Sequence, residues 1–425
     1  MLSDAKSRQL MEVGEGAPMG ELMRCYWHPV AAVSEFDDKE TKALRLMGEN
    51  LVLYKDRGGN YGLLDRHCPH RRADLSYGFV EDCGLRCNYH GWLYDHDGNC
   101  TAQPYEDTVN EDTKFRDSVK IKSYPVKELR GLLWAYMGPQ PAPVLPNWEP
   151  FTWDNGFVQI VFSEIPCNWF QCQENSIDPV HFEWMHANWS KRLKGDEGGY
   201  APTHLEVDFE EFDYGFTYHR LREDTTKENE LWTVGRVCLW PNALFTGGHF
   251  EWRVPIDDES TLSVGWFFNR VPSEKEPYVQ DSIPHWTSPI KDRETGRWIT
   301  SHVMNQDFVA WVGQGTLADR TRENLGNSDK GIAMIRKQYF DDMEAVKDGH
   351  DPKAILRDES QNGCVNLPIM ERNRFVKGYS LKDLDGTSTE SRVTTKKFVF
   401  QAGQPEHVKK AYEDAMGFKL SDEGF

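Results

Sequence analysis

The sequence lacks the features that mark a membrane-spanning, secreted or nucleic-acid-binding protein. Its 425 residues contain no apolar run of about 18 residues, the length that a membrane-crossing helix needs. The first residues, MLSDAKSRQLMEVGEG, are charged and contain no apolar signal core. Lysine and arginine are outnumbered, and the formal net charge of -19 at pH 7 opposes nucleic-acid binding, which needs a basic surface. We therefore expect a cytoplasmic protein whose partners include neither membrane nor nucleic acid.

Ligand-like cysteines and nucleotide-binding glycines are also scarce. Of the nine cysteines, only Cys68 and Cys87 have histidine neighbours at a spacing that suits a metal site. We expect the others to be reduced thiols rather than disulfides, as is usual in the cytoplasm. No G-x-G-x-x-G fingerprint follows a predicted strand, so the chain has no recognisable flavin or nicotinamide site. Electrons for any redox reaction must therefore come from a separate protein.

What is present fits a chain of two domains. Hydrophobic residues make up 39% and aromatic residues 12% of the sequence, enough for a sizeable core, and the length suits two domains. Short apolar runs separated by turn residues predict strands from about 44 to 138, and five prolines between 139 and 150 mark a boundary. We expect a lead-in with one helix (about 9–24) at 1–43, an all-β domain at 44–145, and a second domain at 146–425.

The second domain has strands first and helices later. Strands are predicted at 156–165, over the long alternating run at 204–223, and at 231–240 and 261–271. Helical stretches are predicted at about 168–190, 298–312, 329–347 and 404–416. This order is typical of an α+β domain in which helices cover an antiparallel sheet.

The segment CPHRRADLSYGFVEDCGLRCNYHGW, residues 68–92, contains two pairs of metal ligands. Cys68-x-His70 and Cys87-x-x-His90 enclose a gap of 16 residues. Structural zinc binds cysteine and histidine tetrahedrally, whereas a Rieske [2Fe–2S] centre holds one iron by two cysteines and the other by two histidines. One Cys–His pair on each of two loops favours the iron cluster, because each loop then offers one ligand to each iron. The flanking residues predict β-hairpins rather than the helix of a zinc finger, which also favours iron.

A second group of candidate ligands lies in CNWFQCQENSIDPVHFEWMH, residues 167–186. His181 and His186 are five positions apart, which rotates them away from a common face of a regular α-helix. If both bind one metal, the helix must be broken or bulged there, and Pro179 stands where a break can begin. Two histidines and a carboxylate form the facial triad of non-haem Fe(II) oxygenases, which leaves positions open for O₂. The carboxylate stays open at this point, and the candidates are Glu174, Asp178, Glu183 and the distant Asp307.

Together these motifs resemble the oxygenase (α) component of the Rieske non-haem iron aromatic-ring oxygenases of the phthalate-dioxygenase type. The resemblance covers most of the chain and rests on GAPMGELMRCYWHPVA, CPHRRADLSYG, CGLRCNYHGWLYDHDGNC, PCNWFQCQENSIDPVHFEWMH and NQDFVAWVGQGTLADRTRENLGNSD. One departure is CPHRRA, where glycine often follows the first arginine in the family. The resemblance implies an α+β chain with an N-terminal all-β Rieske [2Fe–2S] domain and a C-terminal catalytic domain. Helices cover the curved antiparallel sheet of that catalytic domain.

Carried over residue by residue, the resemblance also implies the ligand sets. It makes Cys68, His70, Cys87 and His90 the cluster ligands, and His181, His186 and Asp307 the ligands of a mononuclear Fe(II). Asp178 matches a carboxylate that connects an iron histidine to a cluster histidine of a neighbouring subunit. Asn175 matches a polar residue beside the iron. The phthalate-dioxygenase type also implies a homotrimer without a β subunit.

The activity that the resemblance implies is that of a terminal oxygenase. It would use O₂, and electrons from a ferredoxin, a flavin reductase or both, to oxidise an aromatic acid. Within the family the chain looks most like aryl-ether O-demethylases, which would convert a methoxylated, lignin-derived biaryl resembling 5,5′-dehydrodivanillate to a phenol and formaldehyde. The alternatives are cis-dihydroxylation of a phthalate-like or phenoxybenzoate-like acid, and a Rieske electron-transfer protein without oxygenase activity. A respiratory Rieske subunit would need a membrane anchor, which we do not find.

An aromatic acid calls for a cationic side chain near the substrate. Four arginines lie on predicted strands of the catalytic sheet, namely Arg220, Arg222, Arg236 and Arg253. The sequence does not distinguish among them.

Overall fold

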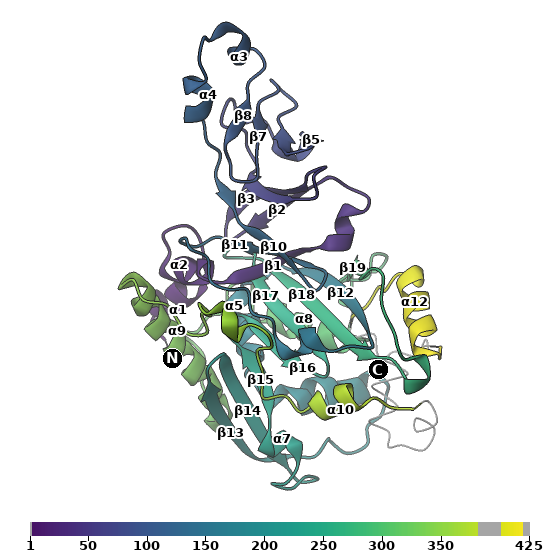
Figure 1. Ribbon diagram of the computed structural model, residues 1–425. Helices are drawn as coiled ribbons and strands as arrows, with labels where there is room; N and C mark the ends of the chain where they lie inside the picture. The colour runs from purple at the N-terminus through teal and green to yellow at the C-terminus, as the bar shows by residue number, and fades with distance from the viewer. Residues whose placement is uncertain (1, 381–400, 420–425) are drawn as a thin grey trace. The chain divides into compact units, whose positions relative to one another are not determined.

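The computed structural model describes residues 2–380 and 401–419, within which the chain divides into two compact units (Figure 1). The N-terminal unit comprises residues 13–143, and the C-terminal unit comprises residues 1–12 together with 144–425. Each unit forms its own sheets. The sequence predicts domain boundaries between residues 43 and 44 and between residues 145 and 146. These boundaries remain predictions.

Small antiparallel sheets make up the N-terminal unit. The strands predicted from about 44 to 138 are confirmed, and the hairpins predicted beside the ligand motif are β3–β4 before it and β7–β8 after it. The sheets are β1 (Trp27–Ala32), β11 (Leu132–Tyr136) and β10 (Val126–Leu129); β2 (Thr41–Leu46), β3 (Glu49–Lys55), β4 (Tyr61–Asp65) and β9 (Ser123–Tyr124); and β5 (Phe79–Glu81), β6 (Gly84–Arg86), β7 (Leu93–Tyr94) and β8 (Cys100–Ala102). The short helices are α2 (Pro18–Arg24), η1 (Val33–Phe36), η2 (Leu75–Tyr77), α3 (Glu106–Val109) and α4 (Lys114–Ser118).

The C-terminal unit is built on one large sheet with the strand order β13-β14-β15-β16-β17-β18-β12-β19 (Figure 1). Its longest pairing runs the full length of β12 against β18. The predicted antiparallel arrangement is confirmed for every neighbour except β19, which pairs with β12 in parallel. The strands are β12 (Gly156–Ile165), β13 (His204–Phe212), β14 (Gly215–Arg222), β15 (Arg236–Leu239), β16 (Ala243–Thr246), β17 (His249–Pro255), β18 (Thr261–Arg270) and β19 (His285–Thr287).

The longest helix of the same unit buries one face. In α9, Ile335, Tyr339 and Met343 recur every four residues and are buried, as an amphipathic helix requires. The predicted helices at 298–312, 329–347 and 404–416 are confirmed as α8, α9 and α12. The helices are α1 (Asp4–Met11), η3 (Glu149–Thr152), α5 (Trp169–Asn175), η4 (Phe182–Trp189), α6 (Ser190–Leu193), α7 (Glu230–Thr233), η5 (Ser273–Lys275), α8 (Val303–Gly313), η6 (Asn327–Asp329), α9 (Lys330–Lys347), η7 (Glu359–Gln361), α10 (Arg372–Lys377) and α12 (Glu406–Met416).

Three local predictions are wrong. The single helix expected at 9–24 is two helices, α1 and α2, because Pro18 starts a new helix at its first turn. The single strand expected at 204–223 is the hairpin β13–β14, since the alternation of apolar and polar residues continues through the turn before Gly215. Gly215 has φ +155°, and a Cβ there would lie 2.2 Å from the carbonyl oxygen of Cys238. The strand expected at 231–240 begins only at Arg236, because Asn229 caps the short helix α7.

Two expectations about the whole chain can be compared directly with the structure. All nine cysteines lie in the described residues, and no disulfide joins any two of them there. Across the described residues, no helix combines the length and the apolar character that crossing a bilayer demands.

Candidate active site

The predicted cluster ligands lie on two loops of the N-terminal unit. Cys68 and His70 follow β4, and Cys87 and His90 follow β6. Each loop closes on itself: the N–H of Arg72 donates to the carbonyl of Cys68 at 2.8 Å, and the N–H of Gly91 donates to that of Cys87 at 3.0 Å. The imidazole rings of His70 and His90 are 4.5 Å apart. The two loops therefore bring the two imidazoles together, and they also bring the two thiols within hydrogen-bonding distance.

The sulfur and nitrogen donors of this cluster occupy different surroundings. Cys68 and Cys87 belong to the hydrophobic core of the unit, whereas His70 and His90 are exposed. The hydrogen bond between the two thiols lowers the pKa of Cys87 and raises that of Cys68. Two adjacent buried sulfurs and two adjacent exposed imidazoles fit a [2Fe–2S] cluster with one thiolate-bound and one imidazole-bound iron.

Two core aromatic residues, which the sequence did not single out, fix these ligands. The hydroxyl of Tyr94 lies 3.2 Å from Sγ of Cys68. The indole of Trp92 stacks on His70 with 4.3 Å between the ring centroids and 7° between the planes. The only available signal was their position directly after the second ligand pair, in HGWLY. Hydrogen bonds to cluster sulfurs are one of the means by which proteins set the reduction potential.

The segment with His181 and His186 forms a π-helix, η4, instead of an α-helix. A π-turn contains an extra residue, so positions i and i+5 lie on one side. The two imidazole centroids are accordingly 5.4 Å apart. Asp178 starts this turn, since its Oδ1 accepts the N–H of Val180 at 2.8 Å. This confirms the bulged helix that the histidine spacing predicts.

Asp307 reaches the two histidines from α8. Its Oδ1 is 3.8 Å from Nε2 of His181 and 3.5 Å from Nε2 of His186. One ligand atom from each of the three residues lies within 4.8 Å of the others. Asp307 is 5% exposed, and burial raises its pKa to about 6 while His181 opposes the shift. A desolvated carboxylate beside two imidazoles needs a cation, and this donor set fits non-haem Fe(II).

Neighbouring polar groups orient the three side chains. Nδ1 of His186 lies 3.0 Å from Oε1 of Gln306, so the ring N–H points to the amide and Nε2 stays free for a metal. Burial lowers the pKa of His186 to about 4, which keeps the imidazole neutral. Nδ1 of His181 is 3.5 Å from Oδ2 of Asp178, and Nδ2 of Asn175 is 3.4 Å from Oδ1 of Asp307. The sequence did not indicate the role of Gln306, although this residue directly precedes Asp307.

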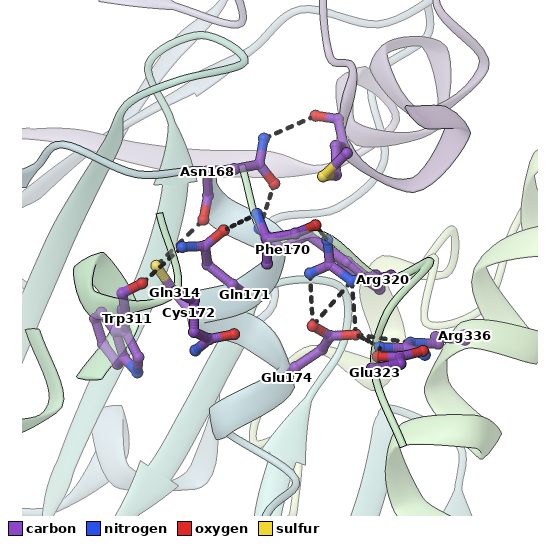
Figure 2. Close-up of polar contacts among 12 residues, drawn as sticks. Asn168, Phe170, Gln171, Cys172, Glu174, Trp311, Gln314, Arg320, Glu323 and Arg336 are labelled. Carbon is purple, nitrogen blue, oxygen red and sulfur yellow. Dashed lines mark hydrogen bonds and ion pairs between the residues drawn. The ribbon is translucent and has the colours of Figure 1, made fainter. Parts of the chain in front are cut away.

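The remaining candidate carboxylates have other partners. Glu183 accepts from Arg220 at 3.0 Å and from Arg222 at 2.7 Å, and it lies 3.0 Å from Nε2 of His204. Glu174 accepts from Arg320 and Arg336, as Figure 2 shows. Asp307 is therefore the carboxylate that completes the three-residue group.

The contacts of α5 hold this region together (Figure 2). Asn168 caps the helix by accepting the N–H of Phe170 at 3.0 Å. The amide of Gln171 donates to the carbonyls of Trp311 at 2.7 Å and Gly315 at 2.8 Å, just where α8 ends. Because α8 carries Asp307 and α5 ends at Asn175, these bonds fix the two elements relative to each other.

Comparisons with known proteins agree with the geometry. A family model described as Rieske [2Fe-2S] domain matches residues 26–125, and one described as LigXa C-terminal domain like matches residues 251–368. The chain is 61% identical over 425 residues, 100% of this chain and 99% of the relative, to the 5,5'-dehydrodivanillate O-demethylase oxygenase subunit of Sphingobium sp. (strain NBRC 103272 / SYK-6). It is 32% identical to the phthalate 4,5-dioxygenase oxygenase subunit of Pseudomonas putida, over 92% of this chain and 95% of the relative.

Solved structures show the same fold at lower identity. The structure of NdmA from Pseudomonas putida CBB5 has a TM-score of 0.56 and 22% identity, and the match covers 78% of this chain and 94% of that chain. An oxygenase and ferredoxin complex of carbazole 1,9a-dioxygenase has a TM-score of 0.54 and 21% identity, with 79% and 94% covered.

These findings place the chain in a family. It belongs to the Rieske non-haem iron oxygenases, as an oxygenase component. It is therefore an oxidoreductase whose cofactors are a Rieske [2Fe–2S] cluster and a mononuclear iron, with O₂ as co-substrate. The zinc interpretation of the first motif is excluded.

Proposed function

We propose that this chain is the terminal oxygenase of an O-demethylase that acts on a methoxylated, lignin-derived biaryl acid such as 5,5′-dehydrodivanillate. The observation that carries the proposal is the 61% identity, over the full length, to an oxygenase subunit named for that activity. The reaction balances as follows: the aryl methyl ether, O₂, two electrons and two protons give the phenol, formaldehyde and water. One oxygen atom enters the methyl C–H bond, and the resulting aryl hemiacetal loses formaldehyde.

The proposed roles of the site residues follow from their positions. Cys68, His70, Cys87 and His90 would hold the cluster, and His181, His186 and Asp307 would hold the iron. When bound, the cluster supplies electrons singly and the iron provides open positions for O₂. Gln306 keeps Nε2 of His186 directed at the metal site, and Asn175 donates to the ligand carboxylate.

The electron supply and the assembly are part of the same proposal. We place a ferredoxin, a flavin reductase or both before the oxygenase, because the sequence carries no nucleotide-binding fingerprint of its own. The reductant would be NAD(P)H, which suits a cytoplasmic enzyme. The resemblance to the phthalate-dioxygenase type supports a homotrimer, in which Asp178 connects His181 to a cluster histidine, His70 of the partner subunit or His90 of the partner subunit.

Formaldehyde release tests the proposed reaction. Purified protein is combined with a reductase, NADH, O₂ and 5,5′-dehydrodivanillate, and formaldehyde and the phenol are quantified together. We expect one formaldehyde for each phenol formed, and no ¹⁸O from ¹⁸O₂ in the new phenol, whose oxygen is the ether oxygen of the substrate. His186→Ala, which leaves the cluster loops intact, serves as the inactive control.

A second candidate reaction is ring cis-dihydroxylation. Relatives at 32% identity include the phthalate 4,5-dioxygenase oxygenase subunit and the phenoxybenzoate dioxygenase subunit alpha of Ectopseudomonas oleovorans, which support it. Two ¹⁸O atoms in a diol product, without formaldehyde, would replace the demethylation proposal by this one.

A further inference from the structure

The structure distinguishes among the four arginines of the catalytic sheet. Arg220 and Arg222 both donate to Glu183, and Arg253 forms an ion pair with Glu251 at 2.8 Å. Within residues 2–380 and 401–419, Arg236 forms no ion pair, and its Nε and Nη1 are buried without a hydrogen-bond partner. Arg236 is half-buried, and a partly desolvated guanidinium without an anion is costly. Of the four arginines, it is the one that lacks the carboxylate partner that the others have.

Arg236 lies next to the metal-binding helix. Its guanidinium carbon is 4.2 Å from the ring centroid of Phe182, the first residue of η4. The ring of Phe182 is in turn 4.4 Å from the imidazole of His181 and 5.5 Å from that of His186. The guanidinium is thus one aromatic ring away from both proposed iron ligands, well within the length of a biaryl acid.

A hydroxyl group stands beside this guanidinium. Tyr218 pairs directly with Arg236 across strands β14 and β15, so both side chains lie on the same face of the sheet. Tyr218 is 1% exposed, and its hydroxyl interacts with the Arg236 guanidinium but has no other hydrogen-bond partner in the described part of the chain. A hydroxyl and a guanidinium together offer the donors that a carboxylate accepts.

The charge around Phe182 is also out of balance. Arg220 lies 4.9 Å from the same ring, so two guanidinium groups face one benzene ring. Glu183 is shared by Arg220 and Arg222, and no further carboxylate of the described residues pairs with Arg236. Burial, followed by the neighbouring Arg236, lowers the pKa of Arg220 to about 10. The side chains around Phe182 therefore carry an excess of positive charge, which favours binding of an anion.

We propose that Arg236, with the hydroxyl of Tyr218, binds the carboxylate of the aromatic substrate and sets the position of its ring beside the iron. The inference rests on the proposed function for the substrate being an aromatic acid. Arg236 is then a specificity-determining residue: it selects acids over uncharged aromatics of the same shape.

Binding to the oxygen-free holoprotein tests this directly, by calorimetry with two matched probes. The first is 5,5′-dehydrodivanillate, and the second is 5,5′-dehydrodivanillin, which has aldehydes where the first has carboxylates and keeps the phenols. We expect Arg236→Met to raise the Kd of the acid roughly 10- to 100-fold and to leave the Kd of the dialdehyde unchanged. The Kd of Arg236→Lys for the acid should lie between the values of the wild type and of Arg236→Met, since lysine keeps the charge but lacks the planar guanidinium. Tyr218→Phe should lower the affinity for the acid less than Arg236→Met does.

Controls separate recognition from folding. Arg357→Met removes an arginine that is paired with Asp351 at 2.7 Å on the surface, and should leave both Kd values unchanged. Arg236→Met should keep its iron content and cluster spectrum, and should lower the unfolding temperature much less than Arg220→Met, which removes one of the two arginines paired with the buried Glu183. A structural role for Arg236 predicts the opposite order.

Either of two results overturns the inference: wild-type affinity of Arg236→Met for the acid, or an equal loss of affinity for both probes. Benzoate, phthalate and 3-phenoxybenzoate extend the test beyond the proposed substrate. If the wild type does not bind 5,5′-dehydrodivanillate but binds one of these three acids, and Arg236→Met loses that binding, the proposed substrate is wrong and the proposed carboxylate site is supported. If the wild type binds none of the acids, the carboxylate site fails as well.

Discussion

At the scale of single residues, one amide side chain decides how a proposed iron ligand faces the metal. Gln306 accepts from Nδ1 of His186, and its own NH₂ group is held by Oγ of Ser190 at 2.8 Å and the carbonyl of Thr300 at 3.1 Å. The amide therefore cannot turn around without losing two bonds. This arrangement fixes both the tautomer and the orientation of the imidazole.

Replacing Gln306 should weaken the mononuclear site without touching the cluster. We expect Gln306→Leu to lower iron affinity or turnover by about 10- to 100-fold, because partners of metal-bound histidines contribute on that scale. Iron content after chelator treatment, measured beside the cluster absorption spectrum, gives the result. Gln314→Leu, an exposed glutamine at the end of the same helix, is the control. Equal loss in both variants would contradict the orienting role.

The hydroxyl of Tyr94 should raise the reduction potential of the cluster. A hydrogen bond to a sulfur ligand stabilises the more negative, reduced state. A net difference of about 1 kcal/mol between the redox states corresponds to roughly 40 mV, so Tyr94→Phe should lower the potential by that order. Redox titration followed by circular dichroism measures it. Tyr54 is buried in the same core, and its hydroxyl has no partner among the described residues, so Tyr54→Phe should leave the potential unchanged.

At the scale of elements, α5 is held by a buried ionic network. Glu174 is the shared acceptor of Arg320 and Arg336, which join α5 to the segment after α8 and to α9 (Figure 2). The side chains of all three residues are 10% exposed or less. The network thus fixes the helix that leads into the π-helix η4, which carries the proposed iron ligand His186.

Glu174→Gln should destabilise the C-terminal unit strongly. Removing one partner of a buried ion pair leaves charge uncompensated and costs roughly 3 to 5 kcal/mol. Denaturant unfolding, followed by tryptophan fluorescence, measures the loss. Glu344→Gln removes an exposed i,i+3 pair with Lys347 on α9 and should cost less than about 1 kcal/mol. Similar stability of the two variants would show that the network contributes little.

At the scale of the whole molecule, the two metal sites belong to different units of the chain. The proposed trimer would bring a cluster of one subunit close to the iron of the next. Asp178 is the residue on which this proposal depends, since its Oδ2 faces His181 and its side chain is 31% exposed.

Asp178→Asn should uncouple the two sites. The variant keeps much of the capping ability but loses the charge, so we expect both metals and the trimer to be retained while turnover falls roughly 100-fold. Stopped-flow absorbance of the pre-reduced cluster, with substrate and O₂, measures the step. Asp292→Asn, in an exposed loop, is the control. Cluster oxidation at the wild-type rate would leave Asp178 only its role as a cap.

The stability of the N-terminal unit should depend on His28 below neutral pH. Its imidazole is fully buried and lies 2.8 Å from the carbonyl of Met23, and burial lowers its pKa to about 4. The unfolded state takes up a proton below pH 6.5, which the folded state does not do until about pH 4. Stability from this group is therefore complete above pH 6.5 and falls by about 1.4 kcal/mol per pH unit towards pH 4.

His28→Gln isolates this contribution. The difference in unfolding free energy between pH 7.5 and pH 5.5 should be smaller in the variant than in the wild type, by about 1 to 1.5 kcal/mol. Urea titrations at both pH values measure it. Parallel pH profiles of the two proteins would mean that His28 does not control the dependence.

Features that depend on neighbours along the chain can be predicted from the amino-acid sequence. The cluster ligands form two short motifs, and His181 and His186 share one segment, so their spacing was enough to predict two metal sites and a bulged helix. The sequence was also enough to locate α8, α9 and α12 and the strands at 156–165 and 261–271. Alternation could not separate one long strand from the hairpin β13–β14, because the pattern is the same on both sides of the turn.

Contacts between residues far apart in the chain became known only from the fold. Asp307 is 132 positions from Asn175, and nothing local distinguished it from Glu174 or Glu183 as a third ligand. Its selection depends on the packing of α8 against η4, and on the arginines that occupy the other two carboxylates. The same holds for Arg236, which looks like its three counterparts in the sequence. The fold places a carboxylate beside each of the other three arginines, whereas no carboxylate of the described residues pairs with Arg236. Ion pairing depends on distances across the strands and not on the order of residues along the chain.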